Sequence, residues 1–155
     1  MKEFNNYGQK FILISFLIFA SLLVFSTKSK AQTNKATIIL IRDVLHDGSV
    51  AASSIFLNDS ILCKLNNKKY SVHEVESGNY NFHAQWGGNR RGSDSRGDIQ
   101  INIEDGKTYY IKFNVVAKAF NGYVGLIEVT ESTYNKLKDE LKLDDKCLKY
   151  FNYVT

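Results

Sequence analysis

The sequence has 155 residues, of which 44% are hydrophobic and 23% charged, so it can bury the core of one ordinary domain. This composition argues against global disorder. The formal net charge of +4 belongs mainly to residues 1–31, and the remainder has a net charge of +1. A nearly neutral domain lacks the broad basic surface that phosphate binding needs, so no nucleic-acid partner is expected.

Residues 11–25 form an apolar run within an uncharged stretch of 17 residues between Lys10 and Lys28. Signal-peptide cores are about 7–15 residues long, and a membrane-spanning helix needs about 20. The pattern predicts an N-terminal hydrophobic helix in residues 1–31 that is either a cleaved signal peptide or an uncleaved anchor. Both interpretations place the domain outside the cytoplasm: periplasmic, secreted, or membrane-anchored and facing outward. Membrane contact is expected only if this segment is retained.

A cleavage site follows this run. Ser29 and Ala31 are small residues at the −3 and −1 positions, so cleavage is expected between Ala31 and Gln32. The pattern of strands and turns begins directly after this point.

The two cysteines, Cys63 and Cys147, form a possible disulfide, because an even pair outside the cytoplasm favours a bridge. Cys63 alternates with Ile61 and Leu65, so its side chain is expected to point inward. A bridge would pin the C-terminal tail, residues 143–155, to the sheet. The alternative is two separate buried thiols.

Seven or eight short strands alternate with turn residues along the chain. We expect them at residues 36–42, 51–57, 60–65, 70–75, 79–86, 99–103, 109–115 and 123–130. The continuous apolar run in 36–42 predicts a central strand buried on both faces. Strand spacing of this kind is typical of a mainly β protein, an antiparallel β-sandwich of the immunoglobulin/transthyretin-like type.

The ends of the strands carry turn and helix signals. Asp105-Gly106 predicts a hairpin between its two flanking strands. Beyond the last strand, Thr130 or Ser132 can cap a short C-terminal helix at 131–142. This helix is expected to cover an edge or one end of the sandwich, so the domain spans residues 36–142.

Several of these segments occur in an order that resembles a known family. The matching pieces are a strand ending in Arg42, a turn with Gly78, and the run Asp105-Gly106-Lys107-Thr108-Tyr109-Tyr110. The chain is similar over residues 36–142 to a bacterial exported β-sandwich family known only as domain of unknown function 2846. The resemblance implies no functional residue. The matching residues have structural explanations. Gly78 and Gly106 are expected to supply positive φ angles in turns, and Tyr109 is expected to fill the core.

The loop at residues 87–97 is the first candidate site. It contains three arginines, Arg90, Arg91 and Arg96, and follows Trp86. It is either a basic finger for an anionic partner or an ordinary solvated loop. Arg96-Gly97-Asp98 also spells a cell-adhesion tripeptide, a match too short to carry weight.

Metal and catalytic sites are not expected. His73 and His83 fall on consecutive strands joined near Gly78, so they can lie close together on the wet face, but two histidines do not complete a metal site. The run from Asp43 to Gly48, with His46 and Asp47, resembles an ordinary acidic turn. No catalytic motif places a nucleophile beside a base, so we expect no enzyme and no cofactor.

Trp86 and Tyr110 are the remaining candidates, as aromatic side chains that stack on sugar rings or anchor a partner. Edge-strand packing under the closing helix and tail is the structural alternative. The sequence thus predicts an exported envelope protein that acts as a non-enzymatic protein-interaction or structural module. The alternative is a carbohydrate-binding module, so the expected partner is an unknown envelope protein or glycan.

Overall fold

The computed structural model describes residues 35–44, 51–117 and 122–147, all within one compact unit that covers Asn34–Thr155. The predicted N-terminal helix with its Ala31–Gln32 cleavage site, His46 and Asp47, and the end of the tail lie outside the described residues. Across the described parts of the chain, no helix is both long and apolar enough to cross a membrane.

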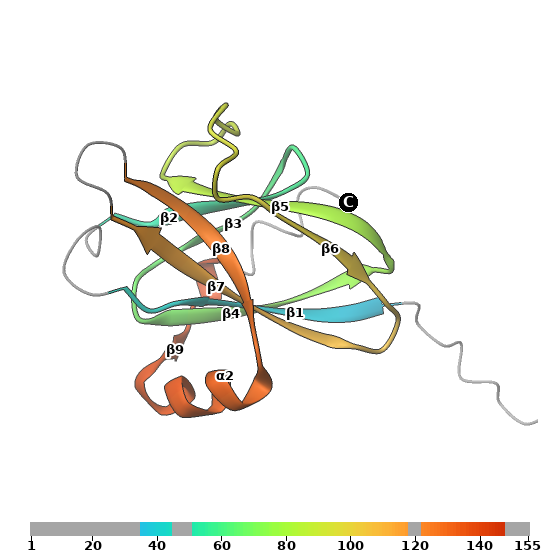
Figure 1. Cartoon of the computed structure of the whole chain (residues 1–155). Helices are drawn as coiled ribbons and strands as arrows, with labels where there is room; N and C mark the ends of the chain where they lie inside the picture. The colour runs from blue at the N-terminus through green and yellow to red at the C-terminus, as the bar shows by residue number, and fades with distance from the viewer. Residues whose placement is uncertain (1–34, 45–50, 118–121, 148–155) are drawn as a thin grey trace, which may run out of the picture. The chain divides into compact units, whose positions relative to one another are not determined.

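Two packed sheets form the fold, and the predicted β-sandwich is confirmed (Figure 1). The five-stranded sheet has the order β8-β7-β1-β4-β9. It contains β1 (Lys35–Arg42), β4 (Lys69–Glu76), β7 (Thr108–Val116), β8 (Tyr123–Val129) and β9 (Lys142–Leu143). The four-stranded sheet has the order β3-β2-β5-β6. It contains β2 (Ser53–Leu57), β3 (Ser60–Leu65), β5 (Gly78–Trp86) and β6 (Ile99–Ile103).

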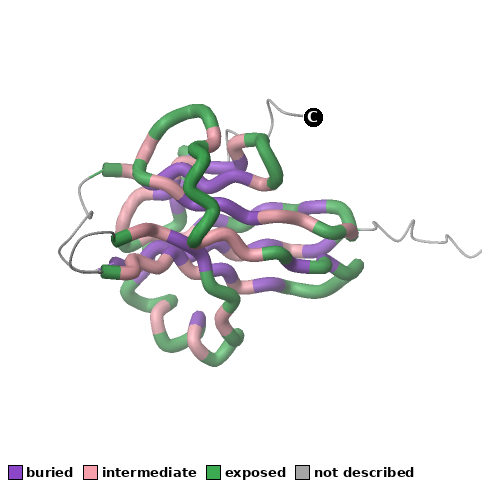
Figure 2. The backbone as a smooth tube through the Cα atoms, turned by 45° about the horizontal axis from the view of Figure 1, so that its top comes forward, coloured by how far each residue is buried: buried purple, intermediate pink, exposed green. Residues whose placement is uncertain are grey.

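Alternation along the strands builds the core between the two sheets. Phe82 and Ala84 of β5 and Ile111 and Phe113 of β7 point inward into one apolar cluster, as the period of two in the sequence predicts. Figure 2 shows the buried residues gathered along the strands, with exposed residues in the connections. Burial of this cluster is the main force that holds the sheets together.

Strand β1 lies at the centre of the five-stranded sheet, as its apolar run predicts. Its inner face contributes Ile38 and Leu40 to the core, while Ile41 on the outer face packs against Tyr134 of α2 (Glu131–Leu137). The oxygen of Thr130 accepts a hydrogen bond from the backbone at the start of this helix. A single 3₁₀ turn, Lys138–Glu140, follows α2, so the α-helix is shorter than the predicted 131–142 and covers the outer face of the sheet.

The prediction of a hairpin at Asp105-Gly106 is wrong. β6 pairs only with β5, whereas β7 pairs with β1 and β8, so the chain crosses here from one sheet to the other. Gly106 has φ 70°, and the hydroxyl of Tyr109 accepts from the backbone N–H of Glu104 at 2.9 Å, which fixes the crossing. The chain also crosses between sheets at Gly78, whose φ is 153°. Two strand pairs, β1 with β7 and β4 with β9, are parallel within this otherwise antiparallel arrangement.

Candidate functional site

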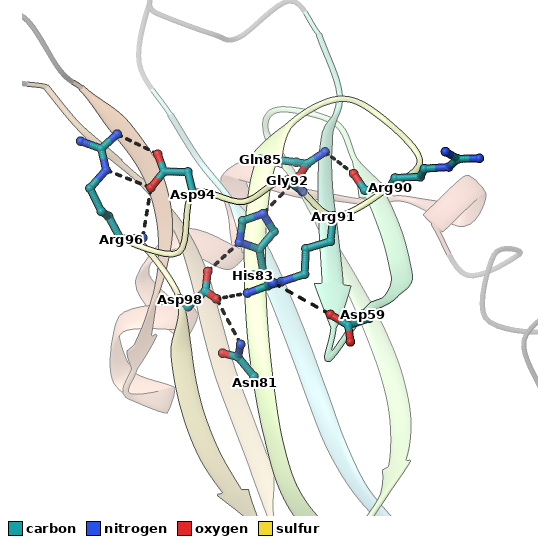
Figure 3. Close-up of polar contacts among 10 residues, drawn as sticks. All are labelled: Asp59, Asn81, His83, Gln85, Arg90, Arg91, Gly92, Asp94, Arg96 and Asp98. Carbon is teal, nitrogen blue, oxygen red and sulfur yellow. Dashed lines mark hydrogen bonds and ion pairs between the residues drawn. The ribbon is translucent and has the colours of Figure 1, made fainter.

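Side chains on the outer face of β5 hold the loop from Gly87 to Asp98 at several points, although most of its residues are exposed (Figure 3). The side chain of Gln85 holds its first half. Its Nε2 donates to the carbonyl oxygens of Gly87 at 2.8 Å and Arg90 at 2.9 Å, and its Oε1 accepts from the backbone N–H of Gly92 at 2.7 Å. These three bonds fix the orientation of the amide.

His83 lies beneath the loop and is only 2% exposed. It points outward because its neighbours Phe82 and Ala84 point into the core. Its Nδ1 lies 2.6 Å from Oδ1 of Asp98, and its Nε2 lies 3.2 Å from Oε1 of Gln85. Both ring nitrogens therefore lie within hydrogen-bond distance of side-chain oxygen atoms.

Asp98, at the end of the loop, forms hydrogen bonds with three side chains. Besides His83, it accepts from Nδ2 of Asn81 at 3.1 Å and from a guanidinium nitrogen of Arg91 at 2.6 Å. Burial opposes ionisation of this carboxyl group, but the hydrogen bonds from the three donors outweigh it and lower the pKa of Asp98. Asp98 is thus the charged centre that holds the second half of the loop.

The three loop arginines have different roles. Arg91 lies against the sheet between Asp98 and Asp59, whose carboxylate is 3.9 Å away. Arg96 pairs with Asp94 at 2.7 Å, and its hydrogen bonds lower the pKa of Asp94 to about 2. The side chain of Arg90 points away from this cluster in Figure 3. Two of the three cations expected for an anionic partner therefore pair with carboxylates of the same surface.

The tripeptide at residues 96–98 is held against β8. A Cβ atom on Gly97 would lie 2.4 Å from the Cα atom of Gly125, so only glycine allows this approach of the two backbones. The carbonyl oxygen of Gly97 accepts from the N–H of Leu126 at 3.0 Å. Because Asp98 is also engaged by His83, the tripeptide is not displayed as an adhesion motif would be.

Trp86 and Tyr110 do not form one binding platform. Trp86 is 45% exposed at the end of β5, where its ring meets the edge of Phe113 at 5.3 Å. Tyr110 lies on the opposite face of β7 from Phe113 and packs 5.2 Å from the ring of Tyr134 in α2. Trp86 instead lines a pocket of about 180 Å³ with Tyr123, at the base of the loop.

Below the loop, the outer face of β5 and β6 carries a shallow groove of about 490 Å³ that sequence reasoning missed. We call it the amide groove. Five of its seven lining residues carry uncharged amides: Asn58, Asn79, Asn81, Gln100 and Asn102. Cross-strand pairing aligns four of them, because Asn79 lies opposite Asn102 and Asn81 lies opposite Gln100. The alternation of β5 placed its two asparagines outward, but only the pairing of β5 with β6 unites the set.

The hypothesis that His73 and His83 lie close together is wrong, because the chain changes sheets at Gly78. His73 points inward from β4 and is 3% exposed, whereas His83 lies on the outer face of the other sheet. His73 lies beside a disulfide that joins Cys63 and Cys147, with its Nε2 3.7 Å from Sγ of Cys147 and 3.0 Å from Oγ of Ser71. The bridge ties the first part of the tail to the core. Of the acidic turn, Asp43 pairs with Lys68 at 2.5 Å.

Comparison with known proteins adds the family. No curated protein and no solved structure matches the chain. A family model described as "Protein of unknown function (DUF2846)" matches residues 32–124, which include β1 to β7 and the whole loop from Gly87 to Asp98. The chain therefore belongs to the DUF2846 family of proteins of unknown function.

Proposed function

We propose that this protein is an exported, non-enzymatic binding module of the cell envelope, and that it binds its partner on the outer face of β5 and β6. One observation carries the proposal: the loop from Gly87 to Asp98 is fixed on one half of this face, and the amide groove lies open on the other half. Asn81 belongs to both, since it lines the groove and donates to Asp98. A rigid loop beside an open polar groove is a preorganised surface.

Two features support export. The uncharged stretch before Lys28 has the length and flanks of a signal peptide or short anchor. The disulfide between Cys63 and Cys147 belongs to an oxidising compartment, because cytosolic thiols are kept reduced.

The surroundings of the two described histidines agree with a protein that binds without catalysis. Both ring nitrogens of His83 hold the loop. His73 and Ser71 are within hydrogen-bond distance, but both are buried in the core, where no substrate reaches them. A catalytic base needs contact with the reacting group, and neither histidine offers it.

The groove favours a neutral, hydroxyl-rich ligand such as a glycan. An amide offers both a donor and an acceptor, and sugar hydroxyl groups do the same. The side chains of Asn79, Gln100 and Asn102 make no hydrogen bond with other described residues, so their amides are open to a ligand. Tyr80 and Ile101 also line the groove, but their side chains pack on the core side of the sheet. Charged ligands find no ion partner among the lining residues.

A protein partner is the second candidate, and the edge of β6 favours it. This strand ends its sheet, and its sequence Ile-Gln-Ile-Asn-Ile contains neither a charge nor a proline. Natural edge strands usually carry such residues to prevent pairing with other chains. A partner strand added beside β6 would use main-chain hydrogen bonds.

Sedimentation of the full-length protein with insoluble cell-wall polysaccharide tests the glycan proposal. We expect retention of the wild type, and loss of most of it in Gln100→Ala/Asn102→Ala, because both changes remove amides from the groove. Asn135→Ala is the matched control, since it removes an exposed amide from α2 on the other sheet.

Equal retention of the groove variant and the wild type would contradict the glycan proposal. Cross-linking in envelope fractions then tests the second candidate, a protein partner at the edge of β6. A defined protein partner that is lost on replacement of Ile101 by proline, which lacks the main-chain donor, would assign the β6 edge to a protein. Absence of both forms of binding would overturn the binding module itself.

A further inference from the structure

We propose that the reduced protein binds one soft, thiophilic metal ion, Zn(II) or Cu(I), through Cys63, Cys147 and His73, and that disulfide formation excludes the ion. The proposal is independent of the function proposed for the outer face. It concerns three buried side chains whose ligand atoms all lie within 4.8 Å of one another.

The donor set fits such an ion. Two thiolates and one imidazole are the ligands that zinc and copper(I) prefer over the hard ligands of magnesium or calcium. Nε2 of His73 faces the sulfur of Cys147 at 3.7 Å. In a tetrahedral zinc site, bond lengths of about 2.3 Å to sulfur and 2.0–2.1 Å to nitrogen place these two atoms roughly 3.6 Å apart. The imidazole already occupies the position of a ligand.

The surroundings favour binding as well. All three residues are buried, so water does not compete for the ion. Ser71 is a fourth polar residue beside these ligands, with its Oγ 3.0 Å from the imidazole nitrogen of His73 and 3.8 Å from Sγ of Cys63.

The chemistry balances in three steps. A dithiol reductant gives two electrons and two protons to the disulfide and becomes a disulfide itself, which leaves thiols at Cys63 and Cys147. The incoming ion then displaces the two thiol protons. Reoxidation needs a disulfide oxidant, which takes two electrons from the thiolates and two protons from the solvent and becomes a dithiol; the S–S bond forms again and the ion is released.

Asp144 holds the segment that carries Cys147 against the core. After reduction, the segment that carries this residue is held by hydrogen bonds of Asp144, whose N–H donates to the carbonyl oxygen of Tyr70 at 2.9 Å and whose carboxylate accepts from Asn66. These bonds keep Cys147 near Cys63 and His73 when the S–S bond is absent. The metal-bound state therefore needs a short shift of one segment instead of a new fold.

Native mass spectrometry of the full-length chain, reduced and oxidised, with one equivalent of Zn(II) or Cu(I), tests the proposal. We expect one ion per reduced chain with loss of two protons, and none on the oxidised chain. His73→Gln should weaken binding by about tenfold or more, at least the effect of losing an outer-shell partner. His83→Gln is the matched control, because that ring lies on the outer face of the other sheet. Its affinity should equal that of the wild type.

Further measurements distinguish Zn(II) from Cu(I), and binding at the folded site from binding to two flexible thiols. Ser71→Ala should weaken Zn(II), which takes four ligands, more than Cu(I), which is satisfied by three. Urea-unfolded reduced chain should bind at least tenfold more weakly than the folded chain; equal affinity would assign binding to two flexible thiols and overturn the site. If His73→Gln does not fold, the NMR signals of the wild-type His73 ring decide: they must shift when the ion binds, and unchanged signals would overturn the proposal.

Discussion

Two histidines of similar burial lie in opposite environments, one on the inner side of β4 and the other on the outer side of β5. His73 is surrounded by the core and the disulfide, and burial lowers its pKa to about 4. His83 is covered by a loop that brings a carboxylate to 2.6 Å from its ring. Similar exposure thus hides different surroundings, because one ring is buried in the core beside the disulfide and the other beneath a surface loop with a carboxylate.

The difference separates the stability of the whole domain from the local order of one surface loop. The region of His73 joins the first part of the tail to the core through Cys63 and Cys147. The region of His83 gives a surface loop one conformation through polar bonds. Changes in the first region should therefore alter the stability of the whole domain, whereas changes in the second should act mainly on the loop.

Loss of the disulfide should give the largest effect. Cys147→Ser opens a cross-link between residues 84 positions apart, and loop-closure entropy predicts a loss of about 2–5 kcal/mol in the free energy of unfolding. Urea denaturation of the oxidised wild type and the variant measures it. Reduction of the wild type in the absence of metal should reproduce most of the loss. A variant as stable as the oxidised wild type would show that the tail contributes nothing to the domain.

The second largest effect is expected from acid, which should lower the free energy of unfolding through His73. The pKa of His73 falls from 6.5 to about 4 on folding, so the unfolded chain binds more protons between these values. Stability is fully present above pH 6.5 and is lost as the pH falls towards 4, by at most about 3 kcal/mol. Denaturation curves at pH 7.0, 5.5 and 4.5 measure this slope. His73→Gln should be much less sensitive to pH over this interval, and an unchanged slope would assign the acid sensitivity to other groups.

The sequence predicted the strands well because alternation and turn residues are local signals. All eight long strands occur near their expected positions, and Cys63 points inward as its neighbours indicate. Which strands pair is not local. Asp105-Gly106 has the composition of a hairpin turn, but it serves equally in a crossing between sheets, where the hydroxyl of Tyr109 fixes the backbone.

The candidate site was less predictable for the same reason. The composition of residues 87–97 identified an unusual loop, but its contacts depend on the flanking residues Gln85 and Asp98. Gln85 belongs to no motif, and the tripeptide that contains Asp98 gave no sign of the contact with His83. The amide groove depends on the register between β5 and β6. A change of sheet at Gly78 separates the two histidines that counting along the strands had brought together. Pairwise placement in three dimensions, which one sequence does not contain, decides each of these points.

The smallest effect distinguishes a structural carboxylate from an exposed one within the same loop. Asp98→Asn should cost about 1–3 kcal/mol, because it removes a charged acceptor from His83 and Arg91. Hydrogen exchange at the N–H groups of Gly92 and Leu126, which bond Gln85 and Gly97, should become faster as the loop opens. Asp94→Asn is the matched control: its exposed pair with Arg96 is screened by water, so stability and exchange should stay nearly unchanged. Similar exchange in both variants would mean that the loop is held by Gln85 and by its backbone contact with β8, and that the carboxylate beneath it only fills space.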